Sequence, residues 1–87
     1  MQQIPETLSV IARAPFNVYY EGSAEAVSAT NKVGRFDILP GHADFFSILQ
    51  SDEVIIEPGG GKEPVSFTIN NGIMTVRDNE VLLFVDM

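Results

Sequence analysis

The stretch VSFTINNGIMTVRDNEVLLFV (Val65–Val85) carries the strongest β-sheet pattern in the chain. Its first five residues alternate apolar and polar side chains, as in a strand with one buried face. Asn71-Gly72 and Asp78-Asn79 separate two further apolar runs, and residues of these types tolerate the positive φ of tight turns. With the run at Val54–Glu57, the stretch predicts an antiparallel meander over the last third of the chain.

The rest of the chain repeats this pattern of short apolar runs that end at Gly, Pro, Asn or Asp. The runs recur about every 8 to 12 residues, the spacing of an all-β sandwich or barrel. No long window has the 3.6-residue periodicity of an amphipathic helix without Gly or Pro. The upstream runs are Thr7–Ala14, Val18–Glu21, Ala26–Thr30, Arg35–Leu39 and Phe45–Leu49.

Length, charge and composition narrow the class of protein. The chain has 87 residues, a net charge of -7 and no cysteine, which predicts one small domain over residues 1–87 without disulfides or thiolate zinc sites. Its acidity disfavours nucleic acid and anionic lipid as partners. The N-terminus lacks a signal peptide pattern, and no apolar run could span a bilayer. We expect a soluble cytosolic domain without direct membrane insertion.

His42, the only histidine, lies in a Pro-Gly turn and has Asp37 and Asp44 nearby in sequence. A zinc site needs three or four convergent ligands, and a general base needs a nucleophile or a substrate pocket. The sequence shows neither the further ligands of a zinc site nor a nucleophile or substrate pocket for a general base. A structural or interface role is therefore expected for His42, with a small metal-dependent or ligand-binding enzyme as the alternative.

The run Gly59-Gly60-Gly61-Lys62 superficially resembles a phosphate-binding loop. Glu63 and Pro64 follow it instead of Ser or Thr, so a hairpin loop is the expected structure. The scattered carboxylates show no spacing that would mark a catalytic acid and base. No catalytic, cofactor or metal residues are expected, and the residues alone predict a small acidic β-sandwich that binds another protein.

Four segments together resemble a known family: LSVIARAP (Leu8–Pro15), VYYEG (Val18–Gly22), ILPGHA (Ile38–Ala43) and NNGIMTVRDNEVLLFVD (Asn70–Asp86). Their order and spacing are similar to those of the N-terminal β-sandwich of the epsilon subunit of F-type ATP synthases, called delta in mitochondria. The resemblance implies a two-sheet antiparallel β-sandwich of about ten short strands. The family's C-terminal helical hairpin is expected to be absent, and with it nucleotide binding.

The resemblance also implies a function. Such a chain would be a non-catalytic rotor subunit of the central stalk, coupling proton-driven rotation to ATP synthesis at the cytoplasmic face of the inner (plasma) membrane. Its expected partners are the gamma subunit and the c-ring. The implied gamma contacts are Ala14, His42, Phe45 and Ser47, with Phe46 as a further candidate. The implied c-ring contacts are Thr30, Asn31, Lys32, Val33, Gly34 and Arg35.

Some residues depart from the family pattern. Arg35 stands where the family usually has a carboxylate, and Asp37 and Asp44 replace residues of other types. If the ring contact is kept, the loop of the ring should carry complementary negative charge. The departures also leave an alternative open, in which an epsilon-like sandwich is reused as a free-standing protein-interaction adaptor.

Overall fold

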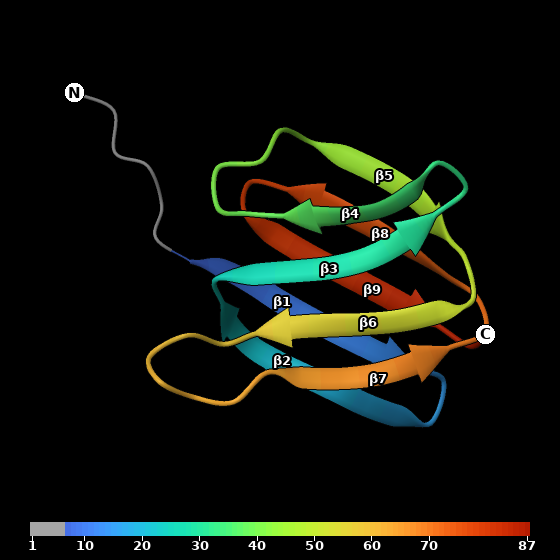
Figure 1. The fold of residues 1–87 in the computed structure, drawn as a ribbon, viewed down its shortest axis with the longest axis horizontal. Coiled ribbons are helices and arrows are strands. Elements are labelled where there is room, and N and C mark those ends of the chain that lie inside the picture. The colour runs from blue at the N-terminus through green and yellow to red at the C-terminus, as the bar shows by residue number, and fades with distance from the viewer. Residues whose placement is uncertain (1–6) are drawn as a thin grey trace.

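The computed structural model describes residues 7–87, which form nine β-strands (Figure 1). Residues 1–6 of the predicted domain lie outside the described part. Each run predicted as a strand overlaps one observed strand. Residues 7–87 contain no helix long and apolar enough to cross a membrane. The strands are β1 Leu8–Ala14, β2 Asn17–Ala24, β3 Ala26–Asn31, β4 Gly34–Ile38, β5 Phe45–Leu49, β6 Asp52–Glu57, β7 Val65–Ile69, β8 Gly72–Arg77 and β9 Glu80–Val85.

The strands form two layers, joined by a single residue pair between Asn31 of β3 and Leu49 of β5. Sheet I has the order β2-β1-β9-β8-β5, and sheet II has the order β4-β3-β6-β7. Figure 1 shows sheet II in front of most of sheet I. All pairs in the described part are antiparallel except β1 and β9, which run parallel. The predicted all-β sandwich is confirmed, with this one parallel pair inside sheet I.

The core lies between the two sheets and is filled by alternate residues of their strands. In β9, Val81, Leu83 and Val85 are buried while the residues between them face outward. Each large aliphatic side chain buried in this way contributes about 1.5–3 kcal/mol. The buried core residues are Leu8, Val10, Ala12, Ala24, Val27, Ala29, Ile38, Leu49, Val54, Ile56, Ile69, Met74, Val76, Val81, Leu83 and Val85.

One edge of the sandwich is closed by aromatic stacking. Tyr19 of β2 and Phe67 of β7 belong to the edge strands of different sheets, and their rings stack with centroids 4.3 Å apart and planes 6° from parallel. Both side chains are half-buried and pack against the core. The alternation that predicts an inward Phe67 is therefore confirmed.

The predicted meander is wrong at one of its turns. β7 and β8 lie in different sheets and do not pair, so Asn70 and Asn71 carry the chain across the sandwich instead of closing a hairpin. Asp86 holds this crossing at both ends. Its backbone N–H donates to the carbonyl of Asn71 (2.9 Å), and its carboxylate accepts from the N–H of Asn70 (2.7 Å).

Gly72 also has a different role from the one its Asn-Gly context predicts. It does not adopt a positive φ. A Cβ at this position would lie 2.9 Å from the carbonyl oxygen of Phe84 and 2.9 Å from a methyl carbon of Val85. Glycine is therefore required because the backbones of β8 and β9 approach closely here.

The other predicted turns are confirmed. Asp78 and Asn79 both have positive φ (50° and 62°) and join β8 to β9 as a tight hairpin. At Pro40-Gly41, the N–H of His42 donates to the carbonyl of Leu39 (3.1 Å), with Gly41 at a φ of 84°. This is the geometry of a type II turn. The N–H of Gly41 donates to the Asn79 side chain (2.7 Å), which ties the two turns together.

We expect Gly72→Ala to lower the free energy of unfolding by about 1–3 kcal/mol, because the added methyl overpacks backbone atoms that cannot move aside. Chemical denaturation measures this change. Ser66→Ala on the exposed face of β7 is the control, and it should shift stability by less than about 0.5 kcal/mol. Equal effects of the two substitutions would contradict the close approach at Gly72.

Candidate protein-binding surface

The outward side chains of sheet I form two rows that run across four strands. In the first row Ile11, Leu82, Thr75 and Phe46 are cross-strand partners in register. In the second row Arg13, Phe84, Ile73 and Ile48 are paired in the same way. Most of these side chains are apolar although they face away from the core. We call the set Ile11, Phe46, Ile48, Ile73, Leu82 and Phe84 the apolar face.

The apolar face is open to solvent and partly hollowed. Phe46 is 61% exposed, Ile48 is 63% exposed and Phe84 is 36% exposed. An open hollow of about 660 Å³ lies beside Phe46 and Leu82. Asp44, Arg77 and Glu80 also line it and give it a rim of mixed charge. Contiguous exposed apolar surface of this kind marks an interaction site on a soluble domain.

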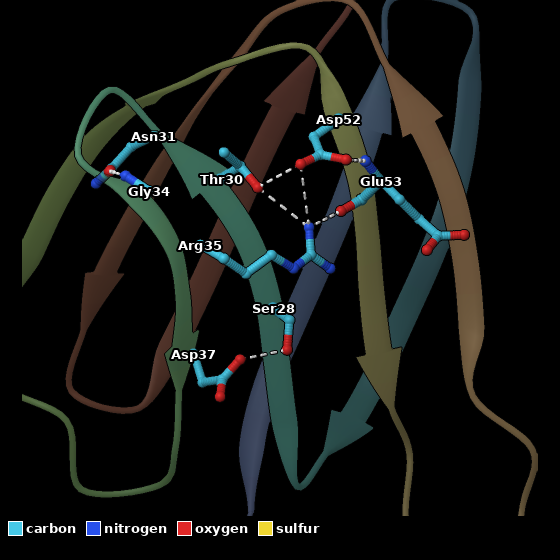
Figure 2. Close-up of polar contacts among 8 residues, drawn as sticks. All are labelled: Ser28, Thr30, Asn31, Gly34, Arg35, Asp37, Asp52 and Glu53. Carbon is cyan, nitrogen blue, oxygen red and sulfur yellow. Dashed lines mark hydrogen bonds and ion pairs between the residues drawn. The ribbon is translucent and has the colours of Figure 1, made fainter.

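The outer face of sheet II instead carries a group of polar side chains that bond one another, as Figure 2 shows. The Ser28 hydroxyl donates to the carboxylate of Asp37 across β3 and β4 (2.6 Å). The Thr30 hydroxyl donates to Asp52 (2.8 Å) and accepts from Arg35 (3.2 Å). These side chains satisfy one another and remain accessible to water, so their hydrogen bonds need no partner protein.

Arg35 is the centre of this polar face. Besides Thr30, its guanidinium donates to the backbone carbonyl of Glu53 and lies 3.8 Å from the Asp52 carboxylate (Figure 2). The arginine therefore connects β4 to β6 across β3. It does not project from the hairpin that carries it.

The environment of Asp52 stabilises its charged form. The backbone N–H of Glu53 (2.7 Å) has the largest effect, and the Thr30 hydroxyl and the Arg35 charge add to it. Together they hold the pKa of the Asp52 carboxyl below its usual range. Hydrogen bonds and positive charge favour a carboxylate over the neutral acid, which explains the direction of the shift.

The residues expected to meet the c-ring, Thr30 to Arg35, form the β3–β4 hairpin. Their side chains do not share one direction. Lys32 and Val33 are at the exposed tip, where Val33 is 96% exposed. The Asn31 side-chain oxygen accepts from the N–H groups of Val33 (2.9 Å) and Gly34 (3.2 Å) and so shapes the tip. Thr30 and Arg35 belong to the polar face.

The residues expected to meet gamma are more deeply placed. Ser47 is only 8% exposed and accepts a hydrogen bond from the Asn31 amide (3.1 Å). Phe45 is half-buried between Phe36 and His42, with ring centroids at 5.4 Å and 5.5 Å. Ala14 is half-buried at the end of β1. Because Ser47 and Phe45 are largely covered, they support the neighbouring surface and offer little area of their own to a partner.

His42 is also half-buried, with Nδ1 2.7 Å from the carbonyl oxygen of Ala43. Its ring meets Phe45 edge-on, at 74° between the planes. Asp37, its neighbour in sequence, bonds Ser28 instead. Within residues 7–87 no group of three or more His, Cys, Asp or Glu side chains is arranged to hold a metal ion.

The outward residues of β5 are Phe46 and Ile48, and the sequence gives only a weak signal for them. The run FFSIL is apolar at four of its five positions, so it lacks the alternation that identifies a buried face. If the inward and outward positions of the strand are assigned one residue out of step, every side chain is placed on the wrong face. The resemblance implies Phe45, Phe46 and Ser47 of this strand as contacts, whereas it does not imply Ile48.

A small β-sandwich with one polar outer face and one exposed apolar face has the surface that is typical of a protein-interaction domain. Residues 7–87 match the family described as ATP synthase, Delta/Epsilon chain, beta-sandwich domain. The chain therefore belongs to the delta/epsilon family of ATP synthase subunits, as the sequence resemblance implies.

Similar proteins support this assignment. The ATP synthase epsilon chain of Trichlorobacter lovleyi is 32% identical over 72 residues, covering 83% of this chain and 51% of the relative. That of Clostridium kluyveri is 32% identical over 82 residues, covering 94% of this chain and 61% of the relative. The chain thus spans little more than half the length of these curated relatives.

Solved structures share the fold at lower identity. A chain of the mitochondrial ATP synthase of Euglena gracilis has a TM-score of 0.86 at 20% identity, covering 97% of this chain and 53% of that chain. One from the mitochondrial ATP synthase of Tetrahymena thermophila has a TM-score of 0.78 at 15% identity, covering 99% of this chain and 67% of that chain.

We expect Asp52→Asn to destabilise the protein slightly at neutral pH. Because the folded-state pKa of Asp52 is lowered, its contribution is fully present above the unfolded value of about 3.9 and is lost as the pH falls through the folded pKa. Thermal unfolding at a series of pH values measures this. The difference between wild type and variant should shrink in acid, whereas a difference that grows in acid would contradict the shift.

Proposed function

We propose that this chain is a non-catalytic rotor subunit of an F-type ATP synthase, in which residues 1–87 form the sandwich domain. The apolar face binds the gamma subunit, and the tip of the β3–β4 hairpin meets the c-ring. The observation that carries the proposal is the contrast between the outer faces of the two sheets. Membership of the delta/epsilon family supports the choice of partners.

The apolar face fits a lasting partner because its exposed rings and branched chains gain free energy when they leave water. Each square ångström of apolar surface removed from water contributes about 25 cal/mol. Phe46 and Ile48 are the most exposed side chains of the apolar face. Large apolar side chains near the centre of an interface usually contribute most to affinity. Arg77 and Glu80 at the rim can fix the orientation of the partner.

The hairpin tip fits a second contact because it projects an exposed Lys32 and Val33 from a turn held by Asn31. The two similar solved structures come from assemblies described as containing a c-ring, which supports placing this contact on the ring. Rotation of the ring would then reach gamma partly through this domain. The subunit would be peripheral, at the cytoplasmic face of the inner (plasma) membrane.

Phe46→Asp tests the gamma contact because it places a charge at the most exposed aromatic position of the apolar face. Titration calorimetry with purified cognate gamma should show affinity reduced by about 30-fold or more. Ser66→Asp, which adds the same charge to the exposed face of β7, should bind like wild type. Circular dichroism and thermal unfolding check that both variants fold.

Two results would count against the proposal: unchanged binding by Phe46→Asp, or no complex between wild type and gamma at micromolar concentration. The second result, with the fold intact, would favour a free-standing adaptor. The cation at position 35, where the family usually has a carboxylate, is the observation that keeps this alternative in view.

A further inference from the structure

A second hollow lies between the tip of the β3–β4 hairpin and strand β5. Its volume is about 400 Å³, and Val33, Phe46 and Ile48 supply its apolar lining. These side chains are 96%, 61% and 63% exposed and come from two separate segments. Lys32 and Gln50 also line it. We call this site the tip hollow.

The tip hollow is held in shape by hydrogen bonds across the junction between the two sheets. Asn31 orders the tip through its side-chain oxygen and donates from its amide nitrogen to Ser47 of β5 (3.1 Å). The N–H of Gln50 donates to the carbonyl of Thr30 (2.9 Å). A partner therefore meets a site whose walls are already ordered, which lowers the entropy cost of binding.

Among the described residues that line the tip hollow, Lys32 is the only charged one. Arg35, the other cation of the hairpin, is directed toward β6, where it contacts Asp52 and the carbonyl of Glu53. That contact is the only ion pair in residues 7–87, so no carboxylate of these residues lies within 4.0 Å of the Lys32 ammonium. A free cation beside an apolar hollow, on a chain of net charge -7, selects a partner that offers a carboxylate next to an apolar side chain.

We propose that the tip hollow receives an acidic loop of the c-ring, with a loop carboxylate paired to Lys32 and a neighbouring apolar side chain set against Val33 and Phe46. This inference rests on the proposed function and specifies the chemistry of its ring contact. It transfers the cationic role from Arg35, where the sequence suggested it, to Lys32. The Phe46 side chain borders both hollows, so the c-ring loop and gamma would bind on either side of Phe46.

The test uses the complex of this chain with cognate gamma, added to c-rings purified in detergent. Lys32→Glu should weaken ring binding by about tenfold, because an attraction becomes a repulsion. Val33→Asp should weaken it by at least as much. Lys62→Glu makes the same charge change in the exposed loop between β6 and β7, and it should bind like wild type. Calorimetry with gamma alone should give one affinity for wild type and all three variants.

Charge exchange sharpens the test. Changing one carboxylate of the ring loop to lysine should restore binding by Lys32→Glu and weaken binding by wild type. The effect of Lys32→Glu should also shrink as salt rises, because exposed charges are screened.

Three outcomes would overturn the inference. Lys32→Glu could bind the ring as Lys62→Glu does, no loop exchange could rescue it, or the tip variants could lose gamma instead of the ring. The gamma contact at the apolar face is tested separately, by the binding of Phe46→Asp to gamma. Failure of wild type to bind either partner would remove the proposed function itself.

Discussion

The burial of alternate side chains between the two sheets is the constraint on which the other features of this protein depend. Every strand supplies inward residues to one continuous core, so the remaining residues of each strand must face outward. Outward residues of neighbouring strands then fall into rows fixed by the strand register. The apolar face exists because apolar residues occupy most of the outward positions in these rows of β1, β5, β8 and β9, in addition to the inward ones.

Asn31 connects the core to both proposed contact surfaces. It lies at the single pairing between the sheets, it shapes the hairpin tip, and it bonds Ser47 behind the exposed Phe46 and Ile48. On the outer face of sheet II, Arg35, Thr30 and Asp52 brace the same hairpin from its polar side. The tip is therefore supported on two sides, which suits the contact with a second partner that we propose for it.

The sequence predicted local features well and the partners of strands less well. The turns at Asp78-Asn79 and Pro40-Gly41 follow from the sequence because their φ preferences act within a turn. The hairpin predicted at Asn71-Gly72 is wrong, because the residue types that favour a hairpin also suit a crossing between sheets. Within the candidate site, Ser47 illustrates the same limit. The resemblance implies a surface contact at Ser47, yet Ser47 is buried and accepts a hydrogen bond from Asn31, which is distant in sequence.

By itself the sequence determined that this chain is an all-β sandwich of the delta/epsilon family, because alternation, turn residues and motif spacing are properties of the chain alone. The tertiary structure decided which side of each strand meets water and where each charge goes. Only the paired strands show that Phe46 and Ile48 face outward, and that Arg35 is held by β6 while Lys32 forms no ion pair within residues 7–87. Such facts depend on register and on contacts between distant segments, which no local pattern encodes.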